Sequence, residues 1–470
     1  MRHALVTAAA MTALPPFARA QSIARFKANP FALLGVASGD PAPTSVVLWC
    51  RLALDLGDVE RWGLDSDSYK VEWEVRPAGQ PSARPVRSGS AIASRDKGYA
   101  AHVEVGGLQP GRPYDYTFRI AGFSAGGRTR TAPAAHVLAD RLRFCFCSCA
   151  EYENELYFGY DEMAKEAPDL IIHLGDYIYE ETYDRFFKSG NDHRARRLKF
   201  DRETPLTTLA QYRRRYAEHK TDPMLQRAHA AAPWVVTWDD HEVANDLAGG
   251  SKQDLEDKAF VERMVAAYRA YFENMPIRLS SLPVRDGRRQ LYRRLDFGRL
   301  MRLHMLDERQ YRDAQACRAA KWPAGKNVPV ADCPEIEAPG RSILGDQQEK
   351  WLAASLDGSQ ARWNVLAQGV MFAHLEARQD PKAGGRTDPH VWTDAWSGYL
   401  PARQRIIDLL WQHRSKGPVV LSGDVHAHFV NRVWRNWKKP GEDFVAPEFV
   451  TASVSSFARE LGALVSDPAN

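Results

Sequence analysis

Cysteine is scarce in this sequence, and neither charge is in large excess. Six cysteines occur among 470 residues, and none of them forms the C-x-x-C pairs that are typical of zinc sites. The formal net charge is +4, and basic clusters such as YRRRYAEHK are interleaved with acidic and aromatic residues. A nucleic-acid-binding protein needs a concentrated basic face, so the composition argues against that class.

Long apolar runs are also missing. After the N-terminal stretch, no segment reaches the ~20 apolar residues that a membrane-spanning helix needs. Residues 1–20 have a short basic start, an apolar run and an Ala-Arg-Ala end, which is typical of a signal peptide cleaved after Ala20. Only one arginine precedes the run, so no twin-arginine signal is visible, although an upstream start codon could hide one. We expect an exported protein, either periplasmic or secreted.

The remaining composition is that of a globular protein. At 44% hydrophobic and 26% charged residues, a chain of this length predicts two or three domains. Export permits disulfides. Cys317 and Cys333 bracket a polar loop, CRAAKWPAGKNVPVADC, and we interpret them as a disulfide that pins the loop. The alternative is two unrelated thiols.

Residues 30–135 predict a small all-β domain. Short β-branched and aromatic runs, such as TSVVLWCRLAL and PYDYTFRIAG, are separated by turns rich in Gly, Pro and Asp. The stretch GLQPGRPYDYTFRI, a turn followed by tyrosines, is typical of immunoglobulin- or fibronectin-like sandwiches. No cluster of titratable residues occurs in this region, so we expect it to have a packing or positioning role.

From residue 141 to residue 470 the pattern changes to α/β. Apolar runs such as DLIIHLGDYIY and GPVVLSGDVHAH are typical of strands buried in a central sheet. They alternate with stretches of helical spacing, such as DKAFVERMVAAYRAYFENM and PARQRIIDLLWQHRSKG. This alternation predicts a second, α/β domain.

Four of the predicted strands end in polar side chains that can bind metals. The carboxyl ends of strands are where α/β folds place their ligands, so these side chains are expected to meet. A single Asp at a strand end is weak evidence, because Asp is a common turn residue, but four such ends form a specific pattern. In chain order, the strand ends carry Cys149; Asp176 and Tyr179; Asp240, His241 and Asn245; Asp424 and His426.

These side chains fall into two chemical sets, which predict a dinuclear site with unlike halves bridged by Asp176. A thiolate, a phenolate, a carboxylate and an imidazole favour a transition metal such as iron, and this set is Cys149, Asp176, Tyr179 and His426. Oxygen donors alone suit calcium, magnesium or manganese, and that set is Asp176, Asp240, Asn245 and Asp424. A metal pair of this kind can clamp a phosphate and activate a water.

Two further roles are assigned around Asp240. His241 follows it directly, and a histidine beside a metal ligand can protonate a leaving oxygen; the alternative is a core histidine. Asp239 and Glu242 are interpreted as hydrogen-bonding residues of the loop.

Three of the cysteines, in RFCFCSCAEYE, need a separate interpretation. Their spacing of two places Cys145, Cys147 and Cys149 on one side of a strand. We predict that Cys145 and Cys147 are packing residues and that only Cys149, at the strand end, binds metal. The alternative is a zinc or redox cluster made of all three.

Taken together, several motifs resemble one known family. The segments SCAEYENELYFGYDEMAKEAPDLIIHLGDYIYE, AAPWVVTWDDHEVANDLAGG, LDERQYR, LGDQQEKWL and LSGDVHAH resemble the PhoD-like alkaline phosphatases. That family belongs to the calcineurin-like metallophosphoesterases and is similar to purple acid phosphatases at the site. The N-terminal LGVASGDPAPTSVVLWCRL is similar to the family's small β-domain, so the resemblance covers nearly the whole chain.

The resemblance implies a four-layer αββα core preceded by the small all-β domain. It places the family's iron on Cys149, Asp176, Tyr179 and His426, and its calcium on Asp176, Asp240, Asn245 and Asp424. In LDERQYR it suggests that Arg309 holds phosphate oxygens, with a surface salt bridge as an equal alternative.

Two motifs depart from the pattern of the wider superfamily. Its GNHE motif is DDHE here, so Asp240 takes the position of an Asn ligand and His241 that of the catalytic His. Its GHxH motif is GDVH here, so Asp424 replaces a His. Both changes introduce carboxylates, which favours calcium over zinc on this side.

We therefore predict an exported phosphoesterase that hydrolyses phosphate monoesters or diesters by direct attack of a metal-bound hydroxide. Fe³⁺ and Asp176 activate the hydroxide, Ca²⁺ (alternatively Mg²⁺ or Mn²⁺) neutralises phosphate charge, and His241 assists the leaving group. The expected partner is a small phosphate ester or a phosphate-containing polymer. One rival is a phospholipase D-type or polymer-directed phosphodiesterase; another is a non-catalytic binding protein with the same fold.

Overall fold

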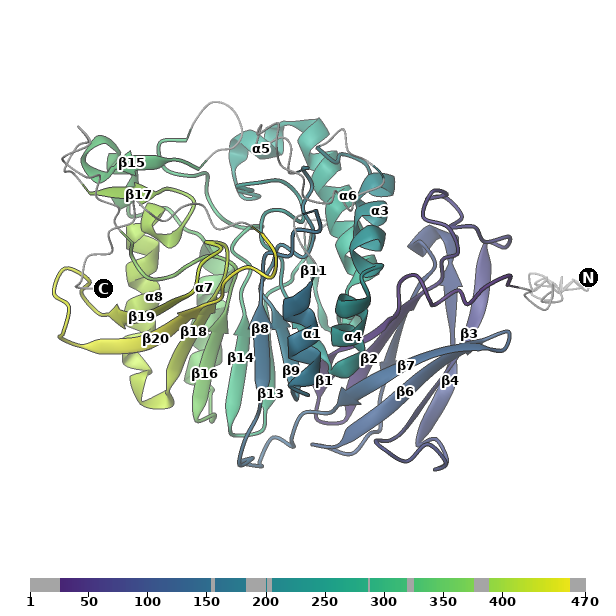
Figure 1. Ribbon diagram of the computed structural model, residues 1–470. Helices are drawn as coiled ribbons and strands as arrows, with labels where there is room; N and C mark the ends of the chain where they lie inside the picture. Colours follow the sequence, from purple (N-terminus) through teal and green to yellow (C-terminus); the bar gives the residue numbers. More distant parts are fainter. Residues whose placement is uncertain are drawn as a thin grey trace, which may run out of the picture.

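The protein is built from two large sheets that pack face to face and are covered by helices on both outer sides (Figure 1). This four-layer αββα arrangement confirms the fold class expected from the sequence. The computed structural model describes residues 26–153, 157–182, 200, 205–285, 288–318, 325–375 and 389–456. The predicted signal peptide, residues 1–20, lies outside this part of the chain.

The first large sheet has the strand order β5-β2-β1-β10-β9-β8. Neighbouring strands from β8 to β1 run parallel, whereas β2 and β5 pair antiparallel at the other end. The strands of this sheet are β1 (Val36–Ala42), β2 (Ser45–Arg51), β5 (Ala100–Val105), β8 (Phe144–Cys147), β9 (Leu170–His173) and β10 (Trp234–Val236).

The second large sheet has the order β13-β14-β16-β18-β20-β19. Its four central strands are parallel, and an antiparallel strand closes each edge. The strands of this sheet are β13 (Arg293–Phe297), β14 (Met301–Met305), β16 (Trp363–Ala367), β18 (Pro418–Ser422), β19 (Phe429–Trp434) and β20 (Phe444–Val450).

Strand β9 shows how the sequence creates the layers. All four of its residues are buried, and successive side chains point to opposite faces. Leu170 and Ile172 enter the core between the sheets, together with Leu303 of β14 and Leu421 of β18. Ile171 faces the helices instead. An unbroken apolar run is therefore required, as the sequence indicated.

Helices cover the two outer faces. The outer face of the first sheet packs against α1 (Phe158–Lys165), α3 (Leu209–Lys220), α4 (Pro223–Ala231) and α6 (Lys258–Asn274). The second sheet packs against α7 (Gly345–Asp357) and α8 (Leu400–Gln412), and a short α5 (Lys252–Glu256) precedes α6. Local capping fixes their starts: Asp222, for example, accepts hydrogen bonds from two amides of α4, which has Pro223 in its first turn.

The N-terminal strands form a sandwich that shares a sheet with the α/β part. A four-stranded antiparallel sheet, β4-β3-β6-β7, packs against the β5-β2-β1 end of the first large sheet around a common apolar core. It lies at the right-hand end of the molecule in Figure 1 and consists of β3 (Ser68–Pro77), β4 (Arg87–Ser94), β6 (Pro113–Ile120) and β7 (Phe123–Arg130). The link is the parallel pairing of Gly39 in β1 with Trp234 in β10. A Cβ at Gly39 would lie 2.2 Å from the carbonyl oxygen of Pro276, so only glycine fits.

Smaller features complete the fold. Two-stranded ribbons are formed by β11 (Val284–Arg285) with β12 (Arg288–Arg289), and by β15 (Asn327–Pro329) with β17 (His390–Trp392). Cys317 and Cys333 are joined by a disulfide, with their Cα atoms 6.0 Å apart. Within the described ranges, no helix has the length and apolar character needed to cross a membrane.

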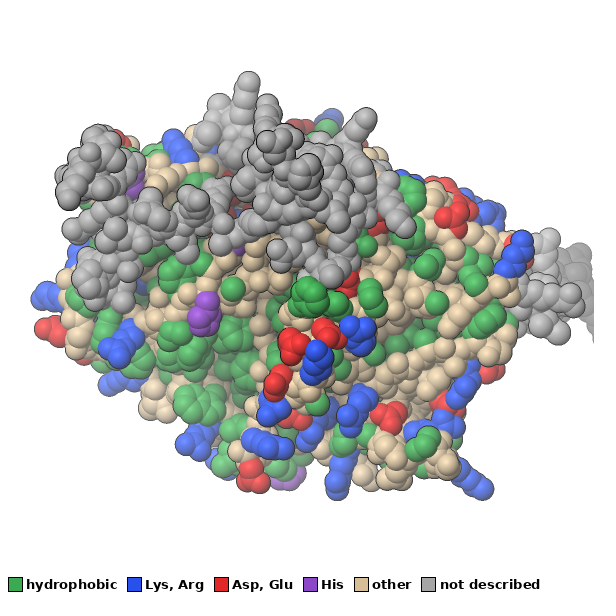
Figure 2. Space-filling view, in the orientation of Figure 1, with side chains coloured by type: hydrophobic (Ala, Val, Ile, Leu, Met, Phe, Trp, Pro, Cys, Tyr) green, Lys and Arg blue, Asp and Glu red, His purple; other side chains and the backbone are tan. Residues whose placement is uncertain are grey.

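Charge is mixed on the surface as well as in the sequence. On the face shown in Figure 2, acidic and basic side chains lie intermixed in the region of α1. There Lys165 and Arg227 both pair with Asp161, at 2.9 Å and 2.6 Å. Such pairs leave no concentrated basic patch in this region.

Candidate metal centre

Most of the polar side chains predicted to meet lie together at the carboxyl edge of the two stacked sheets. Cys149 follows β8, Asp176 follows β9 and Asp240 follows β10, all in the first sheet. Asp424 and His426 follow β18 of the second sheet, so the site is shared between the sheets.

The backbone at this edge adopts an uncommon conformation. Cys149, Asp176, Asp424 and His426 all have positive φ, between 55° and 66°. This left-handed region costs a non-glycine residue on the order of 1–3 kcal/mol, and such strain tends to cluster at functional sites. Four of the residues assigned to the site share this conformation.

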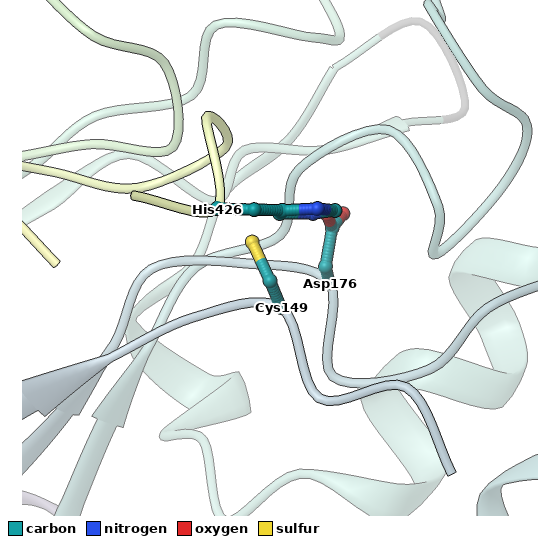
Figure 3. A group of neighbouring side chains, drawn as sticks. All are labelled: Cys149, Asp176 and His426. Atoms are coloured by element: carbon teal, nitrogen blue, oxygen red, sulfur yellow. The ribbon is translucent and has the colours of Figure 1, made fainter. Parts of the chain in front are cut away.

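The predicted transition-metal set is brought together. Ligand atoms of Cys149, Asp176 and His426 all lie within 4.8 Å of one another, and Figure 3 shows the three side chains converging from separate segments. The Tyr179 hydroxyl lies 3.2 Å from Asp176 Oδ2 and 3.2 Å from His426 Nε2. Thiol, carboxyl, phenol and imidazole thus surround a single point.

The oxygen-rich set lies beside it. Ligand atoms of Asp239, Asp240 and Asp424 are within 4.8 Å of one another, and Asp176 and Asp240 also share a group with His241. Asp176 therefore has neighbours in both sets, and its role as a shared ligand stays a prediction. For Asn245 the structure gives a backbone contact, its amide donating to Glu180 at 2.7 Å, and its role as a ligand stays a prediction.

Burial makes these acidic groups difficult to ionise without a cation. Burial raises the pKa of Cys149 and of Asp176 well above their usual values, and neighbouring carboxylates raise both further. Burial and the charge of Asp239 also raise the pKa of Asp424. Asp424 is partly exposed, so the cluster is open towards solvent at this residue. Buried anions are tolerated when they are paired or bind metal, so this donor set fits a pair of cations.

Arg309 is the main positive charge that the chain itself supplies here. Its fully buried guanidinium pairs with Asp239 and with Asp394, and its Nη2 lies 3.6 Å from Asp240 Oδ1 and 3.9 Å from Asp424 Oδ1. Burial alone would raise the pKa of Asp240, but Arg309 and His241 lower it to about 2. Whether Arg309 also holds phosphate, as the sequence suggested, stays a prediction.

His241 sits at the edge of the cluster and is held by a carboxylate. Its Nδ1 lies 2.7 Å from Glu180 Oε2, and its ring centroid is 4.2 Å from that of Tyr179. Burial lowers the pKa of His241, but Glu180, Asp240 and Asp176 outweigh it and raise this pKa well above its usual value.

Sequence reasoning assigned some of these neighbours correctly and missed others. Glu242 is a hydrogen-bonding residue of the loop, as predicted: it accepts from the amides of Asp176, Tyr177 and Asp239. Glu180 was missed, although it directly follows Tyr179. Ser456, whose hydroxyl lies 2.7 Å from that of Tyr179, was also missed, because nothing in the sequence connects it to the strand ends.

Comparisons with known proteins show which family this chain resembles in sequence and fold. Residues 144–468 match the family described as PhoD-like phosphatase, and residues 18–133 match its N-terminal domain. Alkaline phosphatase D of Bacillus subtilis (strain 168) is 39% identical over 448 residues, which are 93% of this chain and 73% of that protein. A solved structure described as "Structure of PhoD" superposes with a TM-score of 0.82 at 39% identity, and the match covers 92% of this chain and 78% of that one.

The fold, the donor cluster and these matches define the class of protein, which is a phosphoesterase. The chain belongs to the PhoD-like phosphatase family. The non-catalytic alternative is thereby set aside.

The positions of the cysteines generate a direct test. Cys147 packs in the core under the helices, and Cys145 packs against it, whereas Cys149 alone lies in the donor cluster. We expect Cys149→Ser to lose most of its bound transition metal, measured by elemental analysis of the purified protein, because an alcohol is a poorer ligand than a thiolate. The matched Cys147→Ser variant should keep its metal and lose at most ~1–3 kcal/mol of stability. Equal metal content in the two variants would contradict the assignment.

Proposed function

We propose that this enzyme is an exported, metal-dependent phosphoesterase with an iron ion and a calcium ion at the Asp176 cluster. The observation that carries the proposal is the meeting of two unlike donor sets on one carboxylate. The set with Cys149, Tyr179 and His426 suits Fe³⁺, and the carboxylate set suits Ca²⁺, with Mg²⁺ or Mn²⁺ as alternatives.

The cations, when bound, supply Lewis acidity that activates a water and neutralises phosphate charge. The remaining roles fall to side chains of the protein itself. Arg309 compensates part of the carboxylate charge, and Glu242 holds the loop amides on which Asp176 depends. His241 lies at the edge of the cluster, where its proton can reach a leaving oxygen. Asp424 and His426 are partly exposed, which gives a phosphate ester access to the cluster.

The shared carboxylate provides the sharpest test of this function. Asp176→Asn keeps the size of the side chain but removes the charge common to both halves. We expect nearly complete loss of phosphate-ester hydrolysis together with loss of bound metal. Turnover would be followed with an aryl phosphate and metal content by elemental analysis. Normal turnover with normal metal content would refute the dinuclear proposal.

Substrate preference requires a separate measurement. We propose that phosphate monoesters, diesters or both are hydrolysed, and a phospholipase D-type or polymer-directed phosphodiesterase is the main alternative. Rates with an aryl phosphate and with the matching bis-aryl diester separate these possibilities. Activity on the monoester is the expected result; a rate confined to the diester would establish the alternative.

Export is proposed from the N-terminal residues. Their basic start, apolar run and Ala-Arg-Ala end predict cleavage after Ala20. When the full chain is expressed, we expect the mature protein outside the cytoplasm to begin at Gln21. Intact-mass measurement checks this, and a mature protein that retains residues 1–20 would contradict it.

A further inference from the structure

The plane of the Arg309 guanidinium is fixed at two of its three nitrogens. Nε donates to Asp239, and Nη1 donates to Asp394 Oδ2 at 2.8 Å. Because a guanidinium is flat and rigid, these two contacts also set the direction of the third nitrogen. That nitrogen, Nη2, lies 3.6 Å from Asp240 Oδ1 and 3.9 Å from Asp424 Oδ1. Asp394 therefore helps to determine where the charge of Arg309 stands relative to two carboxylates of the donor cluster.

Asp394 directly follows the ribbon of β15 and β17, which is labelled at the upper left of Figure 1. Its neighbour Thr393 exchanges two hydrogen bonds with Lys326: the Thr393 amide donates to the Lys326 carbonyl, and the Lys326 amide donates to Thr393 Oγ1, each at 3.0 Å. The amide of Gly325 donates to Asp246 Oδ2 at 2.9 Å. The ribbon thus reaches the acidic cluster at two points.

A disulfide fastens this ribbon to the segment that precedes it. We call residues 325–333, which carry β15, the arm. Cys333 ends the arm and packs in an apolar cluster that includes one residue of β15 and one of β17. Its partner in the disulfide is Cys317. Two residues before Cys317, Gln315 Nε2 donates to Asp394 Oδ1 at 2.6 Å. The bond therefore joins two segments that both contact or carry the surroundings of Asp394.

The apolar cluster under the arm is small. Its buried members are Ala316, Val328, Cys333, Ile336 and Val391, so one of the two disulfide cysteines is itself part of it. A core of this size is often supplemented by a covalent link. Reduction of the bond would leave the arm to this cluster and to its hydrogen bonds, and the position of Asp394 would be less well defined.

We propose that the Cys317–Cys333 disulfide keeps Asp394 in place behind Arg309, so that the oxidised protein is the fully active form; this inference rests on the function proposed above. Asp394 is then a positioning residue, because it acts through Arg309. The bond forms when the two thiols pass two electrons and two protons to an external disulfide such as oxidised glutathione, which becomes two thiols. Cytoplasmic thiols are kept reduced, so export would bring the enzyme to full activity.

A variant that cannot form the bond provides the first test. Cys317→Ser combined with Cys333→Ala removes both thiols and leaves a small apolar group at the buried position. We expect its kcat/KM for an aryl phosphate to be roughly 10- to 100-fold below that of the oxidised parent, because small displacements of charged groups at a site are costly. Rates are compared well below the unfolding temperature of either protein. Its content of transition metal should be unchanged, since Arg309 contacts Asp240 and Asp424 rather than Cys149.

A redox titration of the parent tests reversibility. In glutathione buffers of increasing oxidising strength, the fraction of protein with the bond is measured by alkylation and intact mass. We expect kcat/KM to follow this fraction and to return when the reduced protein is re-oxidised. The variant that lacks Cys317 and Cys333 controls for action of the reductant on bound metal, because its rate should stay constant. Cys145→Ser, which removes a thiol outside the bond, should respond as the parent does.

A double-mutant cycle tests whether the effect passes through Asp394. Asp394→Asn weakens the hold on Arg309 but leaves the disulfide intact. We expect it to lower kcat/KM to a similar extent, with no further loss when it is combined with the two cysteine substitutions. A disulfide that only stabilises the fold would lower the unfolding temperature on removal and leave kcat/KM of the folded protein unchanged.

Three results would overturn the inference. They are an unchanged kcat/KM in the folded variant without the two cysteines, losses that add to that of Asp394→Asn, or a rate of the parent that does not follow the fraction of protein with the bond. Failure of the proposed function would look different, because the oxidised parent would then hydrolyse no aryl phosphate.

Discussion

Negative charge placed where water is largely excluded is the constraint on which this structure depends. Six carboxylates, those of Asp176, Asp239, Asp240, Asp246, Asp394 and Asp424, lie within a small volume at the edge of the two sheets. Burying carboxylates costs several kcal/mol each unless they are paired. Among the described residues, the buried guanidinium groups of Arg309 and Arg312 both contact Asp394. Of these two, only that of Arg309 also reaches other carboxylates of the cluster. Bound cations would supply the balance, and folding of this edge would then be coupled to the loading of metal.

Backbone hydrogen bonds and turns with positive φ fix the loops that carry these charged side chains. Glu242 accepts three amides from the two loops that carry Asp176 and Asp240, and it thereby ties the ends of β9 and β10 together. Positive φ at Cys149 and Asp424 turns their side chains towards the cluster at a further energetic cost. The apolar layers beneath this edge, in which every residue of β9 is buried, stabilise the fold and offset this cost.

Much of this could be predicted from residues alone, because the signals were local. Apolar runs such as DLIIHLGD mark a buried strand and its polar end in one stretch, so β9, β10 and β18 could be predicted together with the polar residues that follow them. Contacts between distant segments carry no local signal. The pairing of Gly39 with Trp234, which joins the N-terminal strands to the catalytic sheet, was not expected. The contact of the Ser456 hydroxyl with Tyr179 was not expected either, because the two residues are 277 positions apart in the sequence.

Donors from two different sheets make the packing between those sheets part of the site. Cys149 and Asp176 are carried by the first sheet, and Asp424 and His426 by the second, so their separation is set by how closely the sheets approach. That approach is determined by interleaved side chains such as Ile172, which packs in one cluster with residues of both sheets. Close-packed cores transmit a change of even one methylene to their surroundings. A residue far from the donor cluster can therefore alter the distances between the side chains that the two sheets contribute to it.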